Sequence, residues 1–253
     1  TIWSGMWHFS TVGDVSGNVD RNLVVVEIGE GTWCQYCVGS AIGAQELLAN
    51  DHPVAIINNH ISDSFTNTYS NARNSYYNIS GYPTAFFDGL NSSVGGSASV
   101  SMYSTYLPKV NSRIAVQSSY GISASGTFDD NILSLSALVA KPGAGVYNNV
   151  VLHCVITESN LDYNWFSQTQ VHSVNRLMVP DQNGTPISLN TGQWTTIPLN
   201  IVIDNAWDLS NCEVVLFLQN TTSKEIIQGA KYPLTEFIGI PNPPSNVLAV
   251  DNG

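Results

Sequence analysis

The sequence predicts an α/β domain followed by an all-β antiparallel sandwich. From Asn22 to about Gly89, short β-branched runs alternate with stretches of helical spacing, whereas from about Arg113 onward apolar residues alternate with a period of two. The chain has 253 residues, which favours two domains of the usual size of about 100–200 residues. We therefore expect an α/β domain with an N-terminal extension over residues 1–112, and a β-sandwich over residues 113–238.

The elements of the α/β domain follow from the order of these patterns. Leu23–Ile28 and His52–Asn58 are short apolar runs, typical of buried strands in a parallel sheet. Between them, helical spacing predicts a helix with one apolar face made of Val38, Ala41, Ile42, Gln45 and Leu48. The later patterns predict a short helix within 65–79, a strand entering a turn over 84–89, and a closing helix over 98–112 interrupted around Pro108.

The second half contains a series of candidate strands separated by turn residues, over 114–122, 131–140, 149–158, 173–180, 195–203, 212–220 and 225–234. Within 149–158, alternate residues from Val150 to Ile156 share one face, and those from Val151 to Thr157 share the other. Strands of this number and length predict a sandwich of immunoglobulin-like size. The Pro-rich, polar segment 239–253 is predicted to be a linker or tail.

Charge is scarce and mostly negative, with 8 Lys+Arg against 19 Asp+Glu and a formal net charge of -11. An acidic surface repels nucleic-acid phosphates and anionic lipid headgroups, so we expect neither as a partner.

No run of about 20 apolar residues is present to span a membrane as a helix. The first residues lack the basic and apolar regions of a signal peptide, which we interpret as a mature or trimmed chain. A surface rich in Ser, Thr, Asn and Gln is common in exported proteins.

The motif WCQYC, residues 33–37, lies between the first predicted strand and the first predicted helix. Three interpretations are open: a redox pair, two arms of a metal site, or a structural bridge. At a helix N-terminus, unpaired amides and the helix dipole stabilise a thiolate, which is the nucleophile of disulfide exchange. Cys34 is then the attacking thiol, and Cys37, one turn along, resolves the mixed disulfide. Thr32 is placed to cap the helix, and Trp33 to shield one side of the site.

The segment VVVEIGEGTWCQYC, followed by YPTAFFDG, resembles the thioredoxin fold over residues 20–112. The resemblance implies that Pro83 is cis and that its loop, with Tyr82 and Thr84, packs against the cysteines and aligns an incoming chain. It also implies a buried acid shortly before the cysteines. Glu27 is the candidate, one residue further from Cys34 than the family's usual spacing, and Glu30 is the alternative.

The complete layout, with NRLMVPDQNGTPI (residues 175–187) in the second half, is similar to the 28-kilodalton outer-membrane-protein-related family of Gram-negative bacteria. This narrower resemblance implies an exported protein of the periplasm, the outer-membrane surface or the extracellular space.

Other cysteines and polar residues favour simpler interpretations. A structural zinc site needs about four ligands, and the chain has no second C-x-x-C, so we expect no metal and no cofactor. Cys154 and Cys212 lie in apolar alternations, which favours two inert core thiols over a bridge. His60 follows a predicted strand and is expected to be solvated or hydrogen-bonded. Asp63 is expected to cap a helix.

Two functions are compatible with these patterns. The first is an exported thiol–disulfide oxidoreductase that acts on protein thiols or disulfides through the two cysteines. The second is a non-catalytic cell-surface binding or assembly module, in which the thioredoxin-like half is a scaffold and the C-x-x-C bridge is structural. Loss of both cysteines separates them, because only the second function would survive it.

Overall fold

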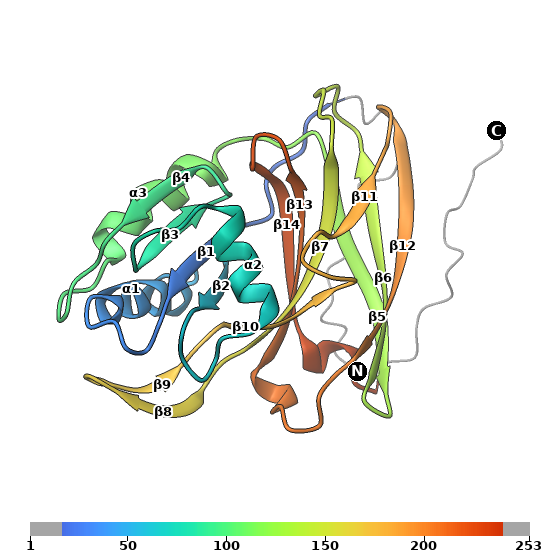
Figure 1. Cartoon of the computed structure of the whole chain (residues 1–253). Helices are drawn as coiled ribbons and strands as arrows, with labels where there is room; N and C mark the ends of the chain where they lie inside the picture. The colour runs from blue at the N-terminus through green and yellow to red at the C-terminus, as the bar shows by residue number, and fades with distance from the viewer. Residues whose placement is uncertain (1–16, 240–253) are drawn as a thin grey trace, which may run out of the picture.

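The structure is a computed structural model that describes residues 17–239 (Figure 1). The predicted linker beyond residue 239 and most of the predicted N-terminal extension, residues 1–16, lie outside the described residues. The α/β half contains β1 (Val24–Glu30), α1 (Cys37–Ala49), β2 (Val54–His60), α2 (Thr68–Tyr76), β3 (Thr84–Phe87), β4 (Asn91–Val94) and α3 (Tyr103–Ile114). The β-rich half contains β5 (Gly121–Asp129), β6 (Ile132–Lys141), β7 (Val150–Glu158), β8 (Leu161–Trp165), β9 (Gln168–Val171), β10 (Val174–Val179), β11 (Thr185–Ile187), β12 (Gln193–Val202), β13 (Cys212–Asn220) and β14 (Ile226–Pro233).

The α/β half has the expected thioredoxin-like arrangement. β1 lies between β2, with which it pairs in parallel, and β3, with which it pairs antiparallel, and β4 follows β3 at the edge. Helices α1 and α3 cover one face of these strands through a common apolar cluster of Val24, Val26, Ile28, Ala44, Leu47, Tyr106 and Val110. The strands and helices predicted for this half are confirmed, with ends displaced by a few residues.

Two local predictions are wrong. Helix α3 runs through Pro108 without interruption, because Tyr106 and Val110 on either side of the proline are buried against the sheet and this packing outweighs one lost backbone hydrogen bond. The strand predicted over 114–122 instead begins at Gly121, because Ile114 is the last residue of α3.

The apolar face predicted for α1 accounts for only part of the helix surface that is buried, because the helix packs on two sides. Ala44 and Leu47 pack on the sheet, whereas Val38 and the half-buried Ala41 and Ile42 contact a second cluster that contains both cysteines. Helix α1 is therefore covered on two sides.

The two halves share one sheet. Its order is β14-β13-β7-β10-β2-β1-β3-β4, with β11 paired to β7, so the β-rich half continues the sheet of the α/β half beyond β2 (Figure 1). A three-stranded sheet, β12-β6-β5, packs against the β-rich part across a core that includes Leu135, Val139, Ile156, Leu199 and Leu216.

Two layers are thus present, but the prediction of a separate sandwich of immunoglobulin-like size needs correction, because one layer belongs to the shared sheet. The predicted boundary after residue 112 falls in the last turn of α3, and the division into independent domains stays a prediction.

The junction between the halves depends on two asparagines at the edge of β2. The backbone amide of Asn58 donates to the Ser173 carbonyl at 2.8 Å, and its side chain donates to the His172 carbonyl at 2.8 Å. The side-chain oxygen of Asn59 accepts a 2.8 Å hydrogen bond from the Asn175 side chain. Only one residue pair, Val174 with Asn58, forms the regular ladder, so side chains supply much of this contact.

A buried ion pair also joins the halves. Arg73 of α2 donates to both carboxylate oxygens of Glu27, at 2.8 and 2.6 Å, and to the side-chain oxygen of Gln219 on β13 at 2.9 Å. The Tyr77 hydroxyl donates to Glu27 at 2.6 Å. Glu27 and Arg73 are both buried, and the negative carboxylate raises the pKa of Arg73 further above its ordinary value, although burial alone would lower it. The geometry is that of a buried ion pair, in which each side chain depends on the other.

Replacing Arg73 with Met should lower the free energy of unfolding by about 3–5 kcal/mol, because Glu27 would be left buried without its cation. Urea denaturation followed by circular dichroism measures the change. The matched double variant Glu27→Leu/Arg73→Met removes both charges and should recover most of the loss. A single variant as stable as the wild type would contradict the ionised pair.

Cys154 and Cys212 are free and buried. Cys154 lies opposite Leu216 and Cys212 lies opposite Glu158 on the paired strands β7 and β13, so the cysteines are offset along the ladder by about 13 Å, too far for a bridge. A thiol count on unfolded, unreduced protein should give two reactive thiols. A count of zero would show that these cysteines are bridged, and a count of four would show that Cys34 and Cys37 are reduced.

Candidate redox site

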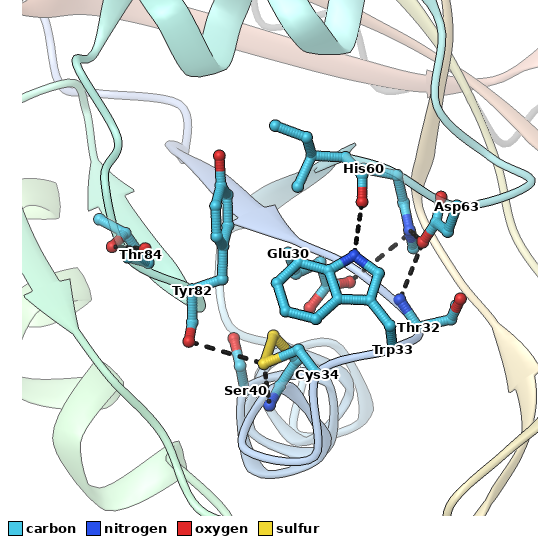
Figure 2. Close-up of a disulfide and its surroundings, with 12 residues drawn as sticks. Glu30, Thr32, Trp33, Cys34, Ser40, His60, Asp63, Tyr82 and Thr84 are labelled. Atoms are coloured by element: carbon cyan, nitrogen blue, oxygen red, sulfur yellow. Dashed lines mark hydrogen bonds and ion pairs between the residues drawn. A yellow bond between two sulfur atoms is a disulfide. The ribbon is translucent and has the colours of Figure 1, made fainter.

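Cys34 and Cys37 are joined by a disulfide at the end of the turn that connects β1 to α1 (Figure 2). Cys37 is the first residue of α1, and Cys34 lies in the turn just before it. The backbone amide of Cys37 donates to the sulfur of Cys34 at 3.2 Å. Cys34 is 6% exposed and Cys37 is fully buried. An incoming group therefore reaches Cys34 first, and the first amide of the helix already points at the sulfur that would carry negative charge.

The loop that precedes β3 packs on this disulfide. The Tyr82–Pro83 bond is cis, as the resemblance implies. The Tyr82 carbonyl oxygen lies 3.5 Å from the Cys34 sulfur, and since a disulfide sulfur has no proton, this is a contact in the oxidised form and a place for a thiol proton in the reduced form. Any side chain at Gly96 would collide with the Tyr36 carbonyl and the Pro83 ring, so glycine allows these loops to meet.

The residues expected to contact a substrate, Trp33, Tyr82 and Thr84, differ in their exposure and in their contacts. Trp33 is 53% exposed, and its indole nitrogen donates to the Ile61 carbonyl at 2.8 Å. It packs edge-on against Tyr82 with ring centroids 5.9 Å apart, and Figure 2 shows both rings beside the disulfide. Thr84 is buried, and its hydroxyl donates to the Gly81 carbonyl at 2.8 Å, so this side chain holds the loop. Tyr36, which was not among the predicted site residues, is 52% exposed beside Cys37.

Thr32 does not cap α1. The residue before the helix is Tyr36, and no side chain caps this end. The Thr32 amide instead donates to Asp63 at 2.8 Å. Asp63 likewise does not cap a helix: its other carboxylate oxygen accepts the Phe65 amide at 3.0 Å and the Thr66 hydroxyl at 3.2 Å, which closes a turn, and the cap of α2 is Asn67. Asp63 thus ties the turn after β2 to the cysteine loop.

Glu27 and Glu30 lie on opposite faces of the sheet. Side chains alternate along β1, so Glu27 points to the face covered by α2, where Arg73 binds it. Glu30 shares the face of Ile28, on which α1 packs, and Figure 2 shows it among the side chains around the disulfide. The structure therefore separates Glu27 from the cysteines and places the alternative candidate, Glu30, beside them.

The Glu30 carboxyl has few polar contacts to offset the cost of its burial. It is 1% exposed, and one of its oxygens has no hydrogen-bond partner within the described residues. Burial raises the pKa of Glu30 to about 7, against a smaller lowering by His60 at 3.7 Å and a raising by Asp63. Burial acts in the same direction on Asp63, but hydrogen bonds from His60, Thr32 and Phe65 outweigh it and lower the pKa of that carboxyl to about 2. Two neighbouring acids thus differ in protonation at neutral pH.

A hairpin from the β-rich half closes the site. Strands β8 and β9 run from the shared sheet toward α1 (Figure 1), and Trp165 is buried in one cluster with Cys34, Cys37 and Val38. A small cavity borders Glu30 and is lined by Ala41, Gln45, Asn58, Trp165, Gln170, Val171 and His172. This hairpin was not predicted, although the alternation of Leu161, Tyr163 and Trp165 before the turn is a weak strand signal.

Two further observations concern partners. Within residues 17–239, no group of three or more His, Cys, Asp or Glu side chains is arranged to hold a metal ion. No helix in this described part combines the length and apolar character that a membrane span requires.

Comparison with known proteins shows likeness in fold. No protein-family model and no curated protein matches the chain. The solved structure of HBP35 of Porphyromonas gingivalis matches 90% of this chain and 82% of its own, with a TM-score of 0.70 and 17% identity. A domain of the outer membrane lipoprotein Omp28 from the same species matches 45% of this chain and 86% of its own at 11% identity, but its TM-score of 0.35 is too low to support an argument. The chain is therefore similar in fold, over most of its length, to HBP35 of Porphyromonas gingivalis.

Proposed function

We propose that this protein is a thiol–disulfide oxidoreductase that acts on the cysteines of other proteins. The placement of Cys34 carries the proposal: it is the more accessible sulfur of the pair, it accepts the first amide of α1, and it contacts the loop of the cis proline. A scaffold bridge requires none of these features. The Trp33 and Tyr82 rings supply an apolar surface beside the sulfur on which a substrate chain lies.

In the reduced protein, the Cys34 thiolate attacks a substrate disulfide, forms a mixed disulfide and releases one substrate sulfur as a thiolate. The Cys37 thiol then loses its proton, and its sulfur attacks Cys34. The Cys34–Cys37 bond forms, the second substrate sulfur leaves, and two electrons have passed to the substrate. The reverse sequence oxidises a substrate dithiol. Because Cys37 is buried, it needs a nearby base, and Glu30 rather than Glu27 lies on its side of the sheet.

We place the protein outside the cytoplasm, in the periplasm, at the outer-membrane surface or in the extracellular space. A formed disulfide supports an oxidising compartment. Similarity to the 28-kilodalton outer-membrane-protein-related family remains part of this proposal, and it rests on the sequence motifs alone.

Replacing Cys34 with Ser should abolish insulin reduction with dithiothreitol as electron donor, because the attacking sulfur is lost. Replacing Cys37 with Ser should trap a mixed disulfide between Cys34 and the substrate, visible on a non-reducing gel. Cys154→Ser is the matched control and should keep activity, because that thiol is buried in the opposite half. Wild-type protein that has an intact, reducible pair but no exchange activity would contradict the proposal and favour the binding module.

Replacing Glu30 with Gln should slow resolution of the mixed disulfide by about 10²-fold or more, because a positioned base is lost. In the wild type, the resolution rate should rise with pH through about 7, where Glu30 loses its proton. The variant should lack this inflection. An unchanged rate and profile would assign the proton transfer to another group.

The same variant has an independent readout in stability. The Glu30 pKa is raised above its ordinary value, so between pH 4.5 and about 7 the folded protein binds more protons than the unfolded chain, and its stability falls as pH rises. Above this window Glu30→Gln should be more stable than the wild type by about 3 kcal/mol, and below it the two should be similar. Equal stabilities at pH 8 would contradict the raised pKa.

A further inference from the structure

Behind Glu30 lies a second pair of polar side chains that the proposed reaction does not use. His60, the last residue of β2, is 1% exposed. Its Nδ1 lies 2.8 Å from Asp63 Oδ2, and its Nε2 lies 3.7 Å from Glu30 Oε1 (Figure 2). The imidazole therefore stands between two carboxyl groups, one on each ring nitrogen.

The hydrogen bonds assign the tautomer of this imidazole. Asp63 also accepts the amides of Thr32 and Phe65, and as an ionised carboxylate it can only accept, so Nδ1 of His60 carries a proton and donates it. Nε2 is left facing Glu30. Within the described residues, neither Nε2 nor Glu30 Oε2 has a hydrogen-bond partner. The Glu30 oxygen nearest to Nε2 is Oε1, at 3.7 Å, so the imidazole and the carboxyl each keep an unpaired polar atom although the two side chains face each other. Buried polar groups of this kind are costly unless the two side chains bond to each other.

We infer that Asp63, His60 and Glu30 form a proton relay, in which His60 Nε2 receives the proton that Glu30 takes from Cys37. This inference rests on the proposed function. In the resolving step the Cys37 S–H bond breaks, its proton moves to Glu30, and its electron pair forms the bond to Cys34. The proton then passes from Glu30 to Nε2, which leaves an imidazolium between two carboxylates. His60 acts through Glu30 and is a positioning residue for it.

The 3.7 Å separation is longer than a hydrogen bond, as is common for catalytic pairs in resting structures. The relay needs a shortening of about 1 Å, since a hydrogen bond of this kind spans about 2.7–2.9 Å. Asp63 holds the imidazole on its far side and compensates the positive charge that His60 gains. The same arrangement orients a histidine in other proton-transferring sites.

Other titratable groups around Glu30 do not replace His60. Tyr106 of α3 is buried and hydrogen-bonded to Ser40, and burial raises its pKa well above its ordinary value, so it stays neutral. His172, before β10, lines the cavity beside Glu30, and burial lowers its pKa. Asp63 is ionised, and Cys37 is the proton donor itself. Of the side chains that face Glu30, His60 is therefore the one placed to share its proton.

The test is the reduction of the Cys34–Cys37 disulfide by dithiothreitol, followed by tryptophan fluorescence across pH and expressed per dithiothreitol thiolate. Cys37 is the leaving sulfur in this direction, so the rate should fall as the pair loses its proton near pH 7. In His60→Gln the fall should move to higher pH by about one unit or more, because the side chain that lowers the pKa of Glu30 is gone. His172→Gln is the matched control and should keep the wild-type midpoint.

A midpoint in His60→Gln equal to or below that of the wild type would overturn the relay. If His60→Gln does not fold, nitrogen-15 NMR of the wild type decides: the Nε2 signal of His60 should change at the midpoint of the rate profile, and a signal unchanged across that pH would overturn the relay. Neither readout depends on insulin. Loss of insulin reduction in the wild type would therefore contradict the proposed function, whereas an unmoved midpoint contradicts the relay alone.

Discussion

The pairing of β10 with the edge of β2 is the contact on which the rest of the molecule depends. Asn58 and Asn59 turn that edge toward Ser173 and Asn175, and through them one sheet continues across both halves. The β8–β9 hairpin leaves the sheet directly before β10 and is thereby carried over α1. Without this junction, the cysteine helix would lose the cover of Trp165, and Glu30 would face solvent.

The shared sheet also separates the roles of two acids that stand three residues apart. Glu27 meets a guanidinium and a hydroxyl on the α2 face, which satisfy both of its carboxylate oxygens. Glu30 meets only a distant imidazole on the α1 face, and burial holds a proton on it near neutral pH. A buried carboxyl whose pKa is raised by its surroundings is a candidate for proton transfer. One strand thus carries an acid that stabilises the fold and an acid suited to chemistry.

The sequence predicts the α/β half well because its signals are local: the apolar run at Leu23–Ile28 and the spacing of the cysteines need no distant partner. The shared sheet was not predictable, because the edge of β2 is completed by a backbone carbonyl, that of His172, and a side-chain amide, that of Asn175, more than a hundred residues away. From the spacing to the cysteines, Glu27 was the candidate for the buried acid and Glu30 the alternative. The face on which α1 packs decides between them, and alternation along a strand does not reveal which face a helix will cover.

Whether Cys34 and Cys37 form an exchanging pair is tested most directly by the reduction potential of this pair, measured with the thiolate pKa of Cys34. The amide of Cys37 and the helix N-terminus stabilise the reduced, ionised Cys34. We expect a potential within the range of known exchange enzymes, about -120 to -270 mV, with a Cys34 pKa below the ordinary value of about 8.5. A potential below about -300 mV with an ordinary thiol pKa would contradict it and identify a structural bridge.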